Sequence, residues 1–138
     1  MIQKTKPQGR DGIRKTDTAA EELLRFSFRY FQNHDELCPK TYSDNYTQKL
    51  AERLKELSNW TVRRFITRME GPVKNHKINW GDTARLEGFG DALPSELRES
   101  EAWQFSITRN EHGRVHGFFI GNTFYIVWLD CNHMLYSN

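Results

Sequence analysis

Apolar and polar residues alternate through the last third of the chain, in the period-two pattern of strands that bury one face. Two turn signals divide this segment into three parts. Gly113 can adopt the positive φ of a tight turn, and Gly121-Asn122 is a two-residue hairpin signal. The pattern therefore predicts an antiparallel β-meander with strands over residues 103–108, 114–120 and 123–130.

The third of these strands is apolar at every position from Phe124 to Leu129. A strand that is covered on both faces has this composition, so we expect it inside the sheet, with helices against one face. After a short turn, residues 133–136 are predicted to add a final edge strand.

The segment from Leu24 to Phe31 also alternates, with apolar residues at the even positions and Arg25, Ser27 and Arg29 between them. Period two with several aromatic residues predicts a strand near the N-terminus. A helix that starts in residues 19–24 and runs through this segment is the alternative, because those residues are good helix formers.

Two helices are predicted in the middle of the chain. Ser43 or Asp44 is positioned to cap the first one, whose apolar stripe is formed by Tyr46, Leu50, Leu54 and Leu57. A second, shorter helix is predicted from about Thr61 and is ended by Gly71-Pro72. Its apolar stripe is formed by Val62, Phe65, Ile66 and Met69. The two helices predict an αα-hairpin.

Residues 73–100 have no sustained period and read as a long connection with one turn of helix near Pro94 to Arg98. A structureless connection of this length is uncommon in a compact domain unless packing orders it. We therefore expect four apolar residues to attach it to the core, namely Trp80, Leu86, Phe89 and Leu93.

The 138 residues suffice for one domain, predicted over residues 19–138, with an α+β fold: an N-terminal strand, an αα-hairpin and a C-terminal antiparallel β-meander. Residues 1–18 are basic, contain little to bury and are predicted to form a disordered tail. Neither a span of about 18 to 20 apolar residues nor a secretory leader is present, so we expect a cytoplasmic protein without a membrane partner. The two cysteines lie far apart and form no metal-binding motif, so neither a metal nor another cofactor is predicted.

Charge is unevenly distributed along the chain. Residues 1–80 carry sixteen Lys and Arg against ten Asp and Glu, and residues 81–138 carry four against eight, which gives net charges of +6 and −4. A phosphate-binding face and an ordinary solvated surface both fit this asymmetry. If the face binds nucleic acid, the candidate residues are Lys49, Arg53, Arg63 and Arg64 on the helices and Arg109 in the meander.

Candidate catalytic residues lie in the meander, since the chain has no P-loop, GxGxxG, GxSxG or HExxH motif. Arg114 and His116 are two residues apart on one predicted strand, so both side chains emerge from the same face. His133 and Tyr136 follow the neighbouring strand and can return towards that face. Such a group of side chains suits phosphodiester cleavage by a ribose 2′-OH. A base removes the proton of the 2′-OH, a cation stabilises the charge on phosphorus, and an acid protonates the leaving 5′ oxygen. Histidine titrates near neutrality, so it can serve as the base or the acid.

Each of these residues also has a purely structural interpretation. His116 can be a hydrogen-bonded, half-buried histidine, and Tyr136 a packed terminal aromatic. Asp130 can serve only to hold the following turn, and an ion pair with Glu111 or Asp130 would explain Arg114 without catalysis.

Several pieces of the meander resemble one known family. They are Phe105-Ser106-Ile107-Thr108-Arg109, Gly113-Arg114-Val115-His116, Phe118-Phe119-Ile120-Gly121-Asn122, Ile126-Val127 and His133-Met134-Leu135-Tyr136. With the preceding strand and αα-hairpin, this order resembles the RelE/ParE superfamily of toxin–antitoxin toxins, many of which are ribosome-dependent mRNA endonucleases. The chain departs from that pattern in its greater length, its acidic 73–100 connection and its less basic meander.

The resemblance implies roles for three residues and two partners. Arg114 matches the arginine that contacts the scissile phosphate, Tyr136 matches the C-terminal tyrosine, and His133 lies near the terminal basic or histidine position. The expected function is a metal-independent RNA endonuclease toxin, with RNA on the ribosome and an antitoxin protein as partners. The alternatives are a non-enzymatic module that binds nucleic acid or protein, encoded on a mobile element, and a ParE-like topoisomerase poison.

Overall fold

A computed structural model of the chain describes residues 20–34, 37, 45–132 and 134–136. The predicted basic tail, the capping candidates Ser43 and Asp44, and His133 lie outside these residues. The described part is an α+β fold with two α-helices and a five-stranded mixed sheet. Its elements in chain order are β1 (Arg25–Ser27), α2 (Tyr46–Leu57), α3 (Val62–Thr67), β2 (His76–Lys77), β3 (Ala102–Ser106), β4 (Arg114–Ile120) and β5 (Thr123–Asp130).

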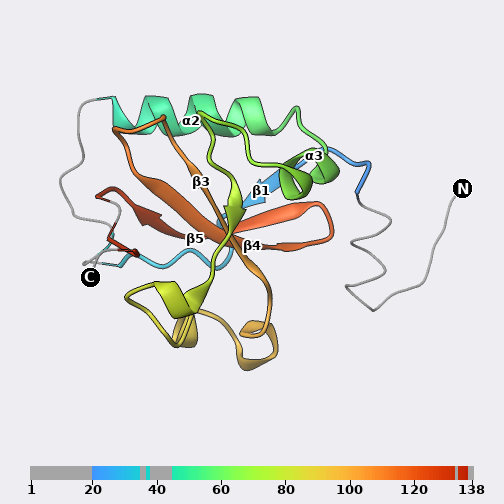
Figure 1. The fold of residues 1–138 in the computed structure, drawn as a ribbon. Helices are drawn as coiled ribbons and strands as arrows, with labels where there is room; N and C mark the ends of the chain where they lie inside the picture. Colours follow the sequence, from blue (N-terminus) through green and yellow to red (C-terminus); the bar gives the residue numbers. More distant parts are fainter. Residues whose placement is uncertain (1–19, 35–36, 38–44, 133, 137–138) are drawn as a thin grey trace, which may run out of the picture.

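The sheet has the strand order β1-β5-β4-β3-β2 (Figure 1). β3, β4 and β5 form the predicted antiparallel meander, and β4 and β5 have the predicted bounds. β1 pairs with β5 in parallel, so β5 has a neighbour on each side, as its uninterrupted apolar sequence predicted. The alternation and turn signals of the last third of the chain therefore predicted this part of the fold correctly.

The N-terminal strand is confirmed, but it is shorter than predicted. β1 covers only Arg25–Ser27, and Ser27 Oγ accepts a hydrogen bond from the backbone N–H of Arg29, which begins a turn. The pairing ends at this turn although β5 continues to Asp130, and the side chain of Phe28 is 50% exposed. After the turn, Gln32 N–H donates to Val127 O of β5. Residues 20–31, which the structure describes, form no helix, so the alternative is not met.

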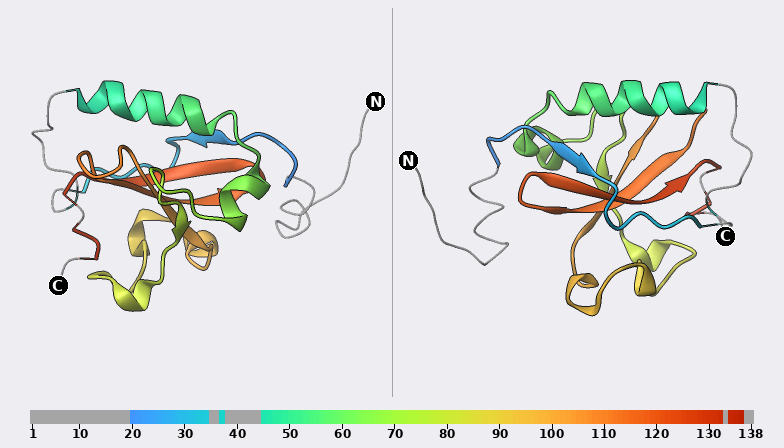
Figure 2. Two further views of the ribbon diagram at one scale, coloured as in Figure 1. Left: turned by 45° about the horizontal axis from the view of Figure 1, so that its top comes forward. Right: turned by 180° about the vertical axis from the view of Figure 1, so that it is seen from behind.

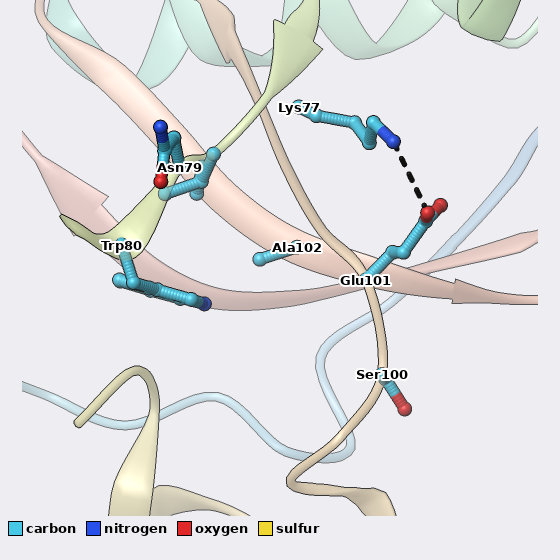
Figure 3. Close-up of a pocket in the computed structure, with 7 residues that line it drawn as sticks. Lys77, Asn79, Trp80, Ser100, Glu101 and Ala102 are labelled. Carbon is cyan, nitrogen blue, oxygen red and sulfur yellow. Dashed lines mark hydrogen bonds and ion pairs between the residues drawn. The ribbon is translucent and has the colours of Figure 1, made fainter. Parts of the chain in front are cut away.

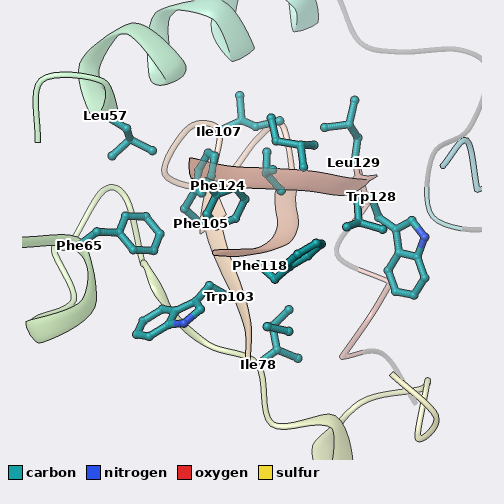
Figure 4. Close-up of a cluster of buried hydrophobic side chains, with 14 of the residues drawn as sticks. Leu57, Phe65, Ile78, Trp103, Phe105, Ile107, Phe118, Phe124, Trp128 and Leu129 are labelled. Carbon is teal, nitrogen blue, oxygen red and sulfur yellow. The ribbon is translucent and has the colours of Figure 1, made fainter. Parts of the chain in front are cut away.

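The two faces of the sheet are covered by different parts of the chain. α2 and α3 cover one face, and the 80–100 connection covers the other (Figures 1 and 2). On the helix side, Phe65 of α3 is fully buried and makes aromatic contacts with Trp103, Phe105, Phe119 and Phe124 (Figure 4). On the opposite face, Phe89 packs against Phe118 and Trp128. Burial of large aromatic side chains on both faces supplies much of the stabilisation of the sheet.

Both helices carry the predicted apolar stripes. Tyr46 and Leu57 of α2 are buried, although the N-cap residue Asn45 makes no side-chain capping bond. α3 is capped by Thr61, whose Oγ1 accepts a hydrogen bond from the backbone N–H of Arg64. The prediction for Met69 is wrong, because α3 ends at Thr67 and the Met69 side chain is 60% exposed.

The 73–100 connection is more ordered than the sequence indicated. It contains β2 and three short 3-10 helices, at Trp80–Asp82, Gly90–Ala92 and Ser95–Leu97, the last of which matches the predicted helical turn. Phe89 and Leu93 are buried and Trp80 packs against the core, as predicted. Leu86 was also expected in the core, but its side chain is 73% exposed.

Residues 134–136 form a turn rather than the predicted edge strand. The Asp130 carboxylate accepts hydrogen bonds from the backbone N–H groups of Met134 and Leu135, at 2.7 and 2.8 Å, and these bonds hold the turn that follows β5. The backbone carbonyl of Leu135 accepts a further bond from Ala84 N–H.

Within the described residues, neither helix has the length and apolar surface that crossing a membrane requires.

Candidate functional site

A cavity of about 290 Å³ lies on the sheet face opposite the helices. Its walls come from β2, β3, β4, β5 and the turn that follows β5, and its lining residues are His76, Gln104, Arg114, His116, Asp130 and Tyr136. The strand register explains this grouping. His76 pairs with Gln104, Gln104 with His116, and Arg114 with Asp130, so these side chains share one face of the sheet.

Two glycines allow β5 to lie close enough to β4 to complete the cavity. Gly113 has a φ of +84°, and a Cβ there would collide with the backbone oxygen of Asp130. A Cβ at Gly117 would collide with the backbone oxygen of Tyr125, at the β-bulge that shifts the register after His116. The close approach at these two points aligns Asp130 with Arg114 and orients His116 towards the cavity.

His76 reaches the cavity because Asn75 fixes the chain just before β2. The Asn75 side chain is buried, donates to the carbonyls of Phe65 and Arg68, and accepts from Glu70 N–H. His76 Nδ1 lies 2.7 Å from its neighbour's backbone oxygen. Because a carbonyl only accepts hydrogen bonds, Nδ1 carries the proton and Nε2 of the neutral ring has the free lone pair.

Arg114 and Tyr136 complete the accessible part of the cavity. Arg114 is half-buried, and burial lowers the pKa of its guanidinium, whereas the charge of Asp130 raises it. The Tyr136 side chain is 37% exposed, and its ring centroid lies 6.3 Å from that of His76. Burial raises the pKa of Tyr136, a hydrogen bond with the Asn79 backbone lowers it, and Asp82 raises it. The cavity thus combines a cation, a phenol proton and an imidazole lone pair.

His116 lies beneath the cavity and is fully buried. Burial, together with the charges of Arg114 and His76, lowers the pKa of its imidazole to about 3. The 3.6 Å separation between His116 Nε2 and Asp130 Oδ2 would favour a protonated ring. Because the loss of hydration outweighs this attraction, His116 is neutral at pH 7 and the contact is not an ion pair.

Several buried polar atoms of the cavity lining have no hydrogen-bond partner among the described residues. They are Gln104 Oε1 and both ring nitrogens of His116. Each such atom costs folding free energy, because it has lost its bonds to water without replacement. Three such atoms on the paired residues Gln104 and His116 mark the floor of this cavity as unusual for a purely structural core.

The structure brings together three of the four catalytic candidates, Arg114, His116 and Tyr136. His133, the fourth, lies outside the described residues. The structural role predicted for Asp130 is confirmed, because its carboxylate holds the turn that follows β5. His116 is fully buried, and its ring nitrogens have no hydrogen-bond partner among the described residues, so it is not the half-buried, hydrogen-bonded histidine of its structural interpretation.

Sequence reasoning missed His76 and Gln104. Gln104 was recognisable, since it occupies a polar position of an alternating strand. His76 gave no comparable signal, because its strand is only two residues long and pairs at the sheet edge.

The candidate nucleic-acid-binding residues fall into two groups. Lys49, Arg53 and Arg109 line a second cavity of about 230 Å³ between α2 and the β3–β4 loop, whereas Arg63 and Arg64 lie on α3. Arg63 forms an ion pair with Glu21, and Arg64 forms one with Glu70. The Arg64 guanidinium also stacks on Trp60. Much of the positive charge of α3 is therefore balanced by acidic neighbours.

Arg53 does not belong to an exposed basic face. Its side chain is only 9% exposed. Its Nε donates to the backbone oxygens of Ser106 and Ile107, and one terminal nitrogen donates to Pro72 O. The guanidinium thus connects α2 to the end of β3, which is a structural role.

A third cavity, of about 360 Å³, lies beside β2 and includes Lys77, Asn79, Trp80 and Ala102 in its lining (Figure 3). Lys77 forms an ion pair with Glu101 across it, at 3.2 Å. The Asn79 side chain bonds with Gly81 and Asp82. These polar groups satisfy one another, so this cavity has weaker signs of a ligand site than the one lined by His76 and Arg114.

No group of three or more His, Cys, Asp or Glu side chains in the described part of the chain is arranged to hold a metal ion. The chain matches no protein-family model, curated protein or solved structure.

Proposed function

We propose that the cavity lined by His76, Arg114 and Tyr136 cleaves RNA by attack of a ribose 2′-OH on the adjacent phosphate, without a metal. The observation that carries this proposal is the convergence of these three side chains on one open cavity from three separate segments of the chain. Their chemistry supplies a proton acceptor, a positive charge and a proton donor, which are the three requirements of this reaction.

The reaction is a transesterification. His76 Nε2 accepts the proton of the 2′-OH, the 2′ oxygen bonds to phosphorus, and the bond to the 5′ oxygen breaks. Tyr136, whose hydroxyl is protonated at neutral pH, donates its proton to the leaving oxygen. Arg114 stabilises the negative charge on the phosphoryl oxygens. The products are a 2′,3′-cyclic phosphate and a 5′-hydroxyl, and solvent returns the proton from His76 to Tyr136.

In this scheme His76 has the role that the sequence suggested for His116 or His133. A fully buried imidazole with a pKa of about 3 neither contacts a 2′-OH nor competes for its proton at neutral pH. His76 is half-exposed, and its Nδ1 bond to the backbone orients Nε2 as the acceptor.

Membership of the RelE/ParE superfamily is part of the proposal. The order of strand, two helices and antiparallel meander supports it, as do Arg114 at the start of β4 and Tyr136 after β5. On this assignment the substrate is mRNA on the ribosome, the protein is a cytoplasmic toxin, and an antitoxin protein neutralises it.

Variants of the three cavity residues test the mechanism. Arg114→Ala and His76→Ala should each lower the rate of RNA cleavage by roughly 100-fold or more, because each removes a group that acts in the transition state. Tyr136→Phe should also lower it, with circular dichroism unchanged. Arg68→Ala, which removes an exposed arginine of the α3 end, is the matched control and should retain full activity. Wild-type rates in Arg114→Ala and His76→Ala would refute the assigned roles.

A further inference from the structure

The buried floor of the cavity and its accessible rim differ in the charge of their side chains. The rim carries the charged Arg114, whereas Gln104 and His116 in the floor are neutral, and the buried Asp130 carboxylate beside them accepts hydrogen bonds from the backbone after β5. The glutamine amide and the neutral imidazole each have both a donor and an acceptor. A phosphate would find few positive groups there and would lose its hydration, so the floor is unsuited to an anion.

The group that complements such a floor is neutral, planar and edged with alternating donors and acceptors. Nucleobases have this character, and single-stranded RNA is read through the edges of unstacked bases. A cavity of about 290 Å³ has room for one ring system and not for several. In the proposed RNA cleavage, the phosphate contacts Arg114. The base of an adjacent nucleotide can then occupy the cavity.

We propose that the floor of this cavity is a nucleobase-binding site in which the Gln104 amide reads the base, with adenine preferred. The inference rests on the proposed function, because RNA is its ligand. Gln104 is 3% exposed, lies at the centre of the row His76, Gln104, His116, and has an amide oxygen without a partner in the described part of the protein. A glutamine amide forms two hydrogen bonds with the adjacent N6 donor and N7 acceptor of adenine.

The floor atoms are sealed from solvent by the side chains above them. A base therefore reaches Gln104 only when a rim side chain is displaced. Tyr136 borders the cavity in the turn after β5, and its side chain is 37% exposed. The unpartnered Gln104 Oε1 is costly in the free protein, and this cost is recovered when a base supplies its hydrogen bond.

Binding of 3′-AMP and ribose 5-phosphate to the full-length protein, measured by calorimetry, tests the inference without requiring cleavage. The wild type should bind 3′-AMP roughly tenfold or more tightly than ribose 5-phosphate. Gln104→Met, which is similar in length and lacks the amide, should lose that preference and retain the affinity for ribose 5-phosphate. Its melting temperature should be unchanged or raised, because the amide oxygen has no hydrogen-bond partner among the described residues.

Gln48→Met is the matched control, since it makes the same change on the exposed face of α2 and should keep the wild-type preference. Equal affinity for the two probes, no binding of 3′-AMP, or a preserved preference in Gln104→Met would each overturn the inference. The proposed function fails by a different result: RNA that stays intact. Base-independent cleavage would uphold the reaction and reject the base site, and binding without cleavage would do the opposite.

Discussion

His116 gives the protein a pH-dependent stability that can be calculated from its burial. Its imidazole has a pKa of about 3 in the folded protein, against about 6.5 in the unfolded chain. Between these values the unfolded state binds one proton more than the folded state. The free energy of unfolding therefore rises with pH by about 1.4 kcal/mol per pH unit in this window, and the stabilisation is fully present above pH 6.5.

Replacement of His116 by leucine removes this contribution. Between pH 7 and pH 5 the wild type should lose about 2 kcal/mol through His116, because 1.5 units of the window are crossed. Urea unfolding followed by tryptophan fluorescence at the two pH values measures the loss. His116→Leu should lose about 2 kcal/mol less than the wild type over the same interval.

Gln104→Met is the control for this experiment, since it changes a buried polar neighbour in the same row and removes nothing that titrates. It should keep the pH dependence of the wild type. An identical loss in His116→Leu and the wild type would show that His116 is not buried as a neutral ring. A larger loss in His116→Leu would show that a protonated His116 pairs with Asp130 across the 3.6 Å contact, contrary to the account given for this site.

Two further predictions concern the framework of the cavity. Arg53→Met should lower the free energy of unfolding, measured by urea titration, by about 3 kcal/mol, because three backbone carbonyls lose a buried donor. The control Arg63→Met removes an exposed ion pair on α3 and should lower it by about 1 kcal/mol or less. Equal losses in the two variants would contradict the structural role of Arg53. Gly117→Ala should prevent β4 and β5 from pairing and yield little folded protein, as judged by soluble yield and circular dichroism. In the control Gly121→Ala the new methyl group meets no atom within 4 Å, and the variant should fold. Its φ of +61° should lower the free energy of unfolding by about 1 to 2 kcal/mol. A folded, stable Gly117→Ala would disprove the close approach of β4 and β5.

Local patterns were sufficient to predict the meander and one face of the site. Period-two alternation and glycine turns depend on neighbouring residues, so the bounds of β4 and β5 followed from them. The shared face of Arg114 and His116 followed from the same period. The burial of Arg114 and His116 could not be predicted in this way. It depends on Tyr136 and on β2, which are distant in sequence.

The missed features depend on contacts between distant segments. A two-residue strand such as β2 has no period to detect, and its position depends on Asn75 and on the edge of β3. Arg53 was misassigned for another reason. It is seven residues after Tyr46 and four before Leu57, so it lies on the apolar stripe of α2 and could have been recognised as buried.

The most direct test of the central claim is to incubate the purified protein with mRNA on translating ribosomes, in parallel with naked RNA and EDTA, and to characterise the new RNA ends. The proposed mechanism predicts fragments with 2′,3′-cyclic phosphate and 5′-hydroxyl ends, formed on naked RNA in the presence of EDTA and absent with Arg114→Ala. RNA that remains intact with the wild type under both conditions would contradict it.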